Sequence, residues 1–324
     1  MTFEENYKNH DKEYLFSNDE FLSEQRENIY NKINLKNYDK KNNESLKNIT
    51  ISDLSLFDYY YQPTKEEARV TLIKKEYYKI NIVNGLCKNY EDDNIEIRNI
   101  SRSDFKSFRD RNEELNDIVI DFNTIFLNSG VFFKIKTNTK LKIRLVHNTH
   151  ENYTIFQNNF FNFQKYSEVE IEEFFNLSNN TINNINYNIQ LNEESVIQHN
   201  IFQDFSNSNK LYLTSNTVCD KKSSFTQNTF NFAEGFVRNF HFARLDGELS
   251  SANLRGCFFL KDNNVCSNKT HIIHNAENCE SNQTYKGILN NNSRANYFSN
   301  TIVSKNAQKT EGYQLSKGIL LNDN

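Results

Sequence analysis

The chain has 324 residues, of which 37% are hydrophobic and 25% are charged, so it is long enough to bury a sizeable core. Its net charge of −4 argues against a dedicated nucleic-acid-binding protein, which would carry a concentrated basic surface. No stretch approaches the ~18 apolar residues of a membrane span, and residues 1–16 lack the apolar run of a signal peptide. Five cysteines without a Cys-x-x-Cys pair favour reduced thiols. We therefore expect a protein of the cytoplasm, or of a stroma-like compartment if the gene is organellar.

Residues 1–76 are polar and are expected to form a largely helical N-terminal region. Ser17 and Glu20 have the spacing of a capping box, in which a hydroxyl and a carboxylate bond free amides of the first helical turn. Leu22, Ile29 and Ile33 then recur at helical spacing. A lead-in of mixed helix and strand is expected over residues 77–139, with a strand over 79–83 and a helix over 103–115.

Strand patterns dominate residues 140–324. Leu141, Ile143 and Leu145 alternate with basic residues, which predicts one apolar face and one charged face. Val169 and Ile171 alternate with glutamates in the same way. Later short runs follow at a spacing in which no clear repeat is visible, and they begin near Ser195, Lys210, Ser224, Phe236, Ser251, Lys269, Gln283 and Arg294.

Many short strands separated by polar turns are typical of a sandwich, a barrel or a solenoid. Two features favour the solenoid. No Asn-Gly hairpin turn occurs among these runs, although asparagine is abundant. Asparagine also tolerates the left-handed backbone of tight corners, and its amides can stack into hydrogen-bonded ladders between coils.

Motifs of catalysis and cofactor binding are absent from the sequence. There is no phosphate-binding loop, dinucleotide-binding turn, zinc-protease helix or nucleophile elbow. Glu168, Glu170 and Glu172 share one strand face, which is most simply the solvent-exposed face. His147 and His150 are expected in a loop just past a strand.

His274 and Cys279 are the candidate metal ligands. They lie five residues apart, and both side chains can hold iron or zinc when deprotonated. Further ligands would have to come from elsewhere. The alternative is a hydrogen bond between coils for His274 and a small buried thiol for Cys279.

Two C-terminal strings, HIIHNAENCESNQTYKGIL (residues 271–289) and NAQKTEGYQLSKGILL (residues 306–321), resemble the SufB/SufD family of iron–sulfur cluster assembly proteins, and the SufD branch in particular. VRNFHFARLDGE (237–248) and ANLRG (252–256) are similar to the middle coils of the family. NIVNG (81–85) and FNTIFLNSG (122–130) are similar to its N-terminal portion. The resemblance covers roughly residues 77–324.

The resemblance implies a right-handed parallel β-helix whose core spans residues 140–324. It implies a non-catalytic scaffold that pairs with a SufB-like subunit and works with a SufC-like ABC ATPase, without nucleic acid or membrane. The iron–sulfur cluster, and a flavin if one is used, are expected on the assembled complex. The residues expected at the subunit interface are Gln283, Tyr285, Lys286, Gln308, Lys309, Thr310, Tyr313 and Gln314.

One departure from the family bears on SufC. Family members continue into a C-terminal helical region that carries a Cys-x-His-Gly string and the surface that docks SufC, and this sequence has no counterpart up to Asn324. SufC binding is therefore in question. Two alternatives stay open, a β-helix enzyme that processes polysaccharides and a purely structural solenoid, and the absence of a secretion signal disfavours both.

Overall fold

A computed structural model describes residues 7, 19–34, 68–104, 115, 117–206 and 209–322. Most of this chain forms two sheets of nine strands each, here called sheet A and sheet B. The longer helices among the described residues are α2 (Glu20–Asn34) and α5 (Ile118–Ile125).

In spatial order, sheet A contains β1 (Arg69–Lys74), β2 (Tyr77–Val83), β6 (Lys140–Thr149), β8 (Glu168–Leu177), β10 (Val196–Gln203), β12 (Ser224–Asn231), β14 (Ser251–Leu260), β16 (Glu280–Leu289) and β18 (Glu311–Leu320). Sheet B contains β17 (Arg294–Val303), β15 (Val265–His274), β13 (Gly235–Leu245), β11 (Asn209–Cys219), β9 (Ile182–Leu191), β7 (Thr154–Phe163), β5 (Val131–Ile135), β4 (Ile95–Asn99) and β3 (Tyr90–Glu91).

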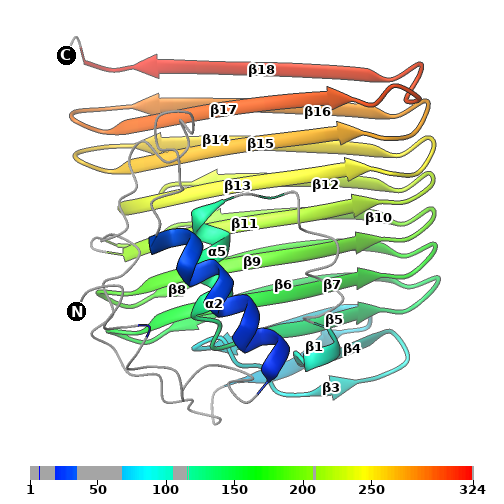
Figure 1. The fold of residues 1–324 in the computed structure, drawn as a ribbon, viewed down its shortest axis with the longest axis horizontal. Helices are drawn as coiled ribbons and strands as arrows, with labels where there is room; N and C mark the ends of the chain where they lie inside the picture. Colours follow the sequence, from blue (N-terminus) through cyan, green and yellow to red (C-terminus); the bar gives the residue numbers. More distant parts are fainter. Residues whose placement is uncertain are drawn as a thin grey trace.

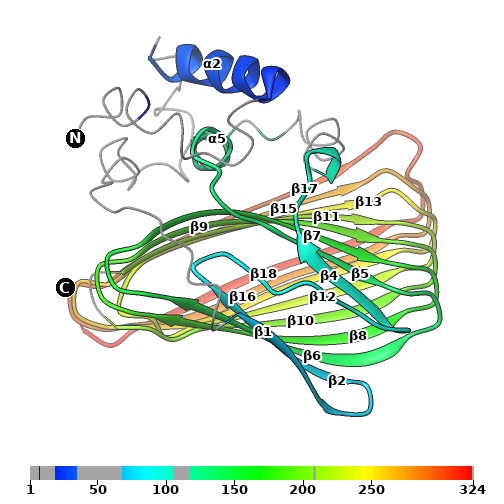
Figure 2. The ribbon, with the colours of Figure 1, turned by 90° about the horizontal axis from the view of Figure 1, so that it is seen from below.

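From β5 onward the chain crosses from one sheet to the other at every turn, and from β7 onward each strand pairs in parallel with the second strand before it. The result is a flattened β-solenoid, with its coils stacked from β5 and β6 up to β18 (Figures 1 and 2). The predicted solenoid is therefore confirmed, and its right-handed sense stays a prediction. The antiparallel strands β1, β3 and β4 lie at the N-terminal end of the stack.

No clear repeat is visible in the sequence, but the structure has an approximate one. Equivalent residues in the first coils lie 28 residues apart, as with Lys140 and Glu168 or Asn200 and Asn228. The spacing falls to 26 residues between β11 and β13 and rises to 31 between β16 and β18. The repeat is one of geometry, because many aligned positions hold unlike residues.

Asparagine ladders connect the coils, as the composition predicted. The Asn228 amide donates to Asn200 at 2.8 Å, and the Asn176 amide donates to Asn148 at 3.0 Å. These side chains repeat one geometry from coil to coil, which fixes the register of neighbouring strands.

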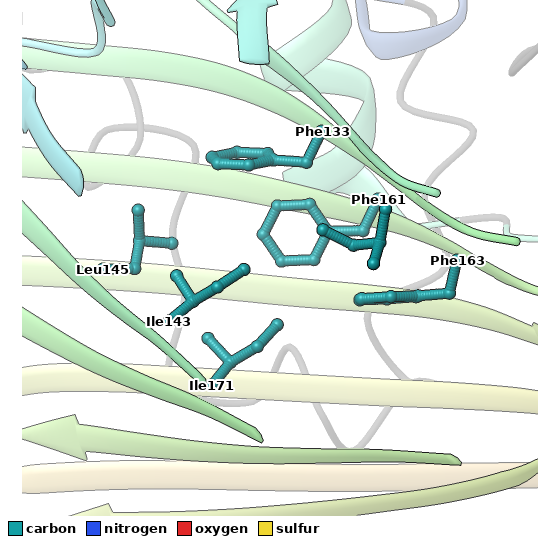
Figure 3. A pocket seen from close by; sticks show the side chains of 7 residues that line it. Phe133, Ile143, Leu145, Phe161, Phe163 and Ile171 are labelled. Carbon is teal, nitrogen blue, oxygen red and sulfur yellow. The ribbon is translucent and has the colours of Figure 1, made fainter. Parts of the chain in front are cut away.

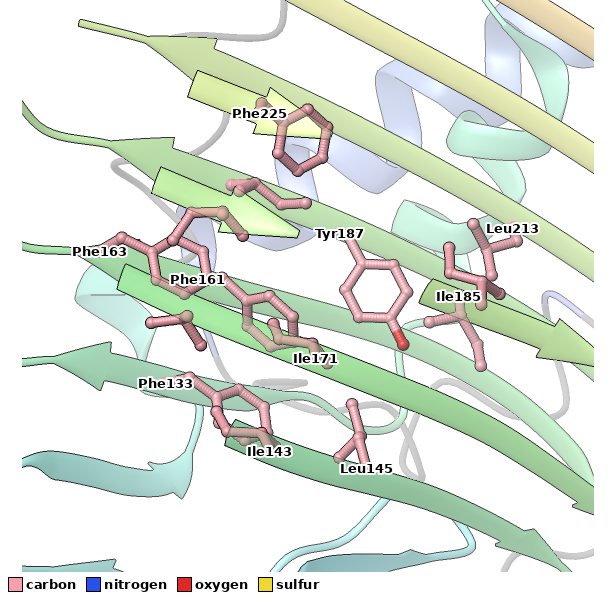
Figure 4. Packing of buried hydrophobic residues seen from close by; sticks show 14 of the residues in the cluster. Phe133, Ile143, Leu145, Phe161, Phe163, Ile171, Ile185, Tyr187, Leu213 and Phe225 are labelled. Atoms are coloured by element: carbon pink, nitrogen blue, oxygen red, sulfur yellow. The ribbon is translucent and has the colours of Figure 1, made fainter. Parts of the chain in front are cut away.

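Alternate residues of both sheets point into one continuous interior. In the first coils this interior is apolar, and rings such as Phe161 and Phe163 from sheet B face aliphatic side chains from sheet A (Figure 4). A cavity of ≈ 10 Å³ remains between Phe133, Ile143 and their neighbours (Figure 3). Its lining is apolar, so it offers a water molecule no hydrogen-bond partner.

The turns that lead from sheet B to sheet A place one residue of each coil in the left-handed region. These residues are Asn138, Tyr166, Glu194, Lys222, Leu249, Asn278 and Lys309. Asparagine occupies this conformation readily, whereas a larger side chain pays ~1–2 kcal/mol of steric cost.

Leu249→Asn is expected to raise the free energy of unfolding by about 0.5–1 kcal/mol. Leu249 has φ 62° and is 50% exposed, so the change relieves strain and removes little packing. Urea denaturation of both proteins measures the effect. Val196→Asn is the matched control, because Val196 is 48% exposed within a strand and should be destabilised by the same change. Equal effects at both sites would contradict the strain argument.

Helices α2 and α5 cover the outer face of sheet B (Figure 2). Ile29 and Ile33 of α2 pack with Val119 and Phe122 of α5, which confirms the predicted helical spacing. The backbone amide of Leu22 donates to the Asp19 carboxylate, which caps α2.

Two further predictions from the sequence fall partly or wholly outside the described residues. Ser17, the expected cap, lies outside the described residues. Of the helix predicted over 103–115, residues 103 and 104 are helical, Leu115 is not, and 105–114 lie outside the described part.

Candidate functional site

A buried carboxylate lies where the interior changes from apolar to polar. Glu173, on β8, points inward and has no solvent exposure. Its two oxygens accept hydrogen bonds from His147 Nε2 and His199 Nε2, each at 2.7 Å. The Tyr187 hydroxyl donates to the oxygen that also faces His147. Four strands, β6, β8, β9 and β10, thus contribute one polar side chain each.

Burial raises the pKa of the Glu173 carboxyl, but the hydrogen bonds from His147 and His199 outweigh it and lower the pKa to about 2. Burial and the neighbouring Glu173 charge raise the pKa of Tyr187 well above 10.0. The carboxylate is therefore ionised and the phenol protonated at neutral pH, so Tyr187 is a donor and Glu173 an acceptor.

The network continues toward the C-terminal coils. Gln227 Nε2 lies 3.5 Å from His199 Nδ1, and Ser215 Oγ donates to Gln227 Oε1 at 3.1 Å. Ser215 also meets His241 Nδ1 at 2.8 Å. Burial lowers the pKa of His241 to about 3, with a further contribution from His199, so His241 is neutral.

This network, from His147 to His241, is fully enclosed, and none of its members is more than 3% exposed. A substrate in solvent cannot reach it. Its visible role is to hold the sheets in one register, because each partner satisfies a polar group that would otherwise be buried alone. Loss of any one member is therefore expected to destabilise the fold strongly.

The expectation for His147 was wrong. His147 lies on β6, not in a loop, and its ring stacks on Phe175 with centroids 4.9 Å apart. His150, by contrast, follows the end of β6 as expected. Sequence reasoning also missed Glu173. The signal was present, since Val169 and Ile171 point inward and the same alternation carries Glu173 into the core.

The structure places His274 and Cys279 on either side of one turn, with separate partners. His274 Nε2 meets Ser281 Oγ at 2.8 Å, and burial lowers its pKa. The Cys279 thiol lies 3.4 Å from the Gly247 carbonyl oxygen. In the part of the chain that the structure describes, no three His, Cys, Asp or Glu side chains form a group that could hold a metal ion. The predicted pair would need further ligands from outside the described residues, and it stays a prediction.

The residues expected at the subunit interface divide into two groups. Gln283 and Tyr285 are buried inside the solenoid, where Gln283 donates to Thr301 at 2.7 Å and Tyr285 stacks on Tyr297. The others lie at or near the surface of the last coils: Lys286, Gln308, Lys309, Thr310, Tyr313 and Gln314.

The C-terminal end of the solenoid is open among the described residues. β17 ends sheet B and β18 ends sheet A, and no described strand pairs with their outer edges (Figure 1). Val303 and Leu320 occupy inward positions, yet they are 54% and 68% exposed because no described coil covers them. Free strand edges beside exposed apolar side chains form a surface that favours association with another sheet.

The protein is thus a parallel β-solenoid in which the outer edges of β17 and β18 have no strand partner among the described residues. A family model, "SUF system FeS cluster assembly, SufBD core domain", matches residues 119–324. The chain belongs to this family, and its role is in iron–sulfur cluster assembly. The family resemblance of the C-terminal strings is thereby confirmed. No curated protein matches the chain. Neither described helix is long and apolar enough to cross a membrane.

Proposed function

We propose that this chain is the SufD-type scaffold subunit, non-catalytic itself, of a complex with a SufB-like solenoid and a SufC-like ABC ATPase. The free edges of β17 and β18 pair with the SufB-like subunit. Iron, sulfide and the growing cluster are cargo of the assembled complex, as is any flavin that the complex uses. His274 and Cys279 are the residues of this chain proposed to face that chemistry.

The open end is the observation that carries the proposal. The Glu311 and Leu321 amides donate to Cys279 and Leu289, at 3.0 and 2.9 Å. Because amides alternate between the two edges of a strand, those of the intervening even-numbered residues, such as Ser316, point to the free edge. A partner strand would satisfy these donors and cover Val303 and Leu320 at the same time.

Ser316→Pro is expected to weaken pairing with the SufB-like subunit at least ~10-fold while leaving the fold intact. Proline removes one donor of the free edge but no bond to β16, and proline is tolerated at edge positions. Affinity is measured by titrating the labelled SufB-like subunit, with circular dichroism as the fold check. Ser316→Ala is the matched control, since it removes the hydroxyl and keeps the amide. Unchanged binding of the proline variant would exclude this edge as the interface.

A further inference from the structure

A separate feature lies on the outer face of sheet A, where β14, β16 and β18 lie side by side. Arg255, Lys286 and Lys317 are exposed there, and none of them forms an ion pair with a described residue. Helices α2 and α5 lie over sheet B, so they leave this face uncovered (Figure 2).

The same face in the earlier coils is different. There the three cations of β6 each meet a carboxylate of β8, as with Lys140 and Glu168 at 2.7 Å or Arg144 and Glu172 at 2.8 Å. In the last coils Arg255, Lys286 and Lys317 have no such partner among the described residues, and the exposed carboxylates of this face, Glu280 and Glu311, lie six residues away at the start of β16 and β18. An acidic partner would complement the three cations.

Apolar side chains form a straight row beside these cations. Phe259, Ile288 and Ile319 are in register on the three strands, and they are 41%, 36% and 58% exposed. Two residues along each strand, Lys286 and Lys317 form a parallel row. Neighbouring strands are ~4.8 Å apart and the two rows are ~6.6 Å apart.

We propose that this face, defined by Arg255, Phe259, Lys286, Ile288, Lys317 and Ile319, docks an acidic amphipathic helix of a partner protein. Carboxylates three and four residues apart on a helix recur every ~4.5–6 Å, which matches the spacing between strands. A helix ~10 Å wide covers both rows at once, with its acidic stripe over the lysines and its apolar stripe over Phe259, Ile288 and Ile319.

The chemistry favours a protein helix over other anionic partners. Surfaces that bind anionic lipid gather about 4–8 cations, whereas this face has fewer and interleaves them with an ordered apolar row. A nucleic acid would not use that apolar row. The inference concerns the face of sheet A and is independent of pairing through the free edges.

Cys257 provides a built-in reporter. It lies on the same face, in register with Lys286, and it is exposed whereas the other four cysteines are buried. Alkylation of Cys257 by iodoacetamide, followed by mass spectrometry, therefore reports whether the face is covered. The probe is a synthetic 18-residue amphipathic helix with one glutamate stripe and one adjoining leucine stripe.

The peptide is expected to slow alkylation of Cys257 at least ~10-fold at saturation, with weaker binding as salt is raised. Lys286→Glu combined with Lys317→Glu should abolish the protection. Lys305→Glu combined with Lys309→Glu is the matched control, because both lysines are exposed, lie off this face and give the same change in charge. That control should keep the protection.

Three results would overturn the proposal. A scrambled peptide of the same composition could protect Cys257 equally well. The Lys305 and Lys309 control variant could lose protection as fully as the Lys286 and Lys317 variant. Either result would show that overall charge, and not the geometry of this face, causes the protection. Protection by phosphatidylserine vesicles without protection by the peptide would assign the face to a membrane instead.

Discussion

Replacing Glu173 by alanine is expected to lower the free energy of unfolding by about 3–5 kcal/mol, the cost of breaking a buried charged network by removing one partner. His147, His199 and Tyr187 all donate to this carboxylate, and all three are buried. Without it their donors lose their acceptor inside the core. Guanidinium denaturation of both proteins measures the change.

The matched control is Glu172→Ala, one residue away on the opposite face of β8. Glu172 pairs with Arg144 and Lys142, whose side chains are partly exposed, so its loss should cost less than ~1 kcal/mol. If the two variants lose equal stability, the buried network contributes no more to the free energy of unfolding than a partly exposed ion pair does.

The pH dependence of stability supplies a second readout for Glu173. Its pKa falls from the ordinary 4.5 to about 2 on folding, so the stabilisation is fully present above pH 4.5 and is lost as the pH falls toward 2. At ~1.4 kcal/mol per pKa unit, the ionisation of Glu173 contributes about 3 kcal/mol to the free energy of unfolding at neutral pH. Glu173→Gln should lack it, and the stability difference between wild type and variant should shrink in acid. A constant difference would contradict an ionised Glu173.

Arg238→Ala should also cost about 3–5 kcal/mol and should loosen α5 from sheet B. Arg238 Nη2 donates to the Asp117 carboxylate, and each side chain of the pair is only 1% exposed. Asp117 also caps α5 by accepting from the Val119 amide at 3.0 Å. Removing the guanidinium leaves a buried carboxylate without its counter-charge. Denaturation and amide exchange of α5 measure the two effects.

A double-mutant cycle separates the charge from the packing at this pair. Asp117→Asn keeps a capping side chain, and Arg238→Met keeps most of the volume, so the combined variant should lose clearly less than the sum of the single losses. Arg244→Ala is the control, because its partner Asp246 is partly exposed and the pair should be worth less than ~1 kcal/mol. Additive losses would mean that the ion pair contributes no coupling.

Several strands of sheet A could be predicted from the sequence because buried and exposed residues alternate along them, as in β8 and β12. The runs expected near Ser224, Ser251 and Arg294 begin at those residues in the structure. The repeat of about 28 residues could not be seen in the sequence, because successive coils share a backbone geometry but differ in length and in residue type. One inward row shows this, since it holds Tyr187, Ser215, His241 and Thr270 at equivalent positions.

The sequence predicts that members of the buried network point inward, but not that they meet. Alternation from Leu141 carries His147 inward, and alternation from Val169 carries Glu173 inward. That these two meet, and that Tyr187 joins them from the opposite sheet, depends on how coils stack across the interior. Such contacts follow from coil length and turn geometry, which no local pattern in the sequence records.

The central claim is that this chain assembles with a SufB-like solenoid. Its most direct test is co-expression of the chain with the SufB-like and SufC-like proteins of the same source, followed by size-exclusion chromatography. We predict a stable complex that contains this chain and the SufB-like subunit, with the ATPase retained through that assembly. Elution of this chain alone, with the SufB-like subunit in a separate peak, would contradict the claim and leave only the fold and the family.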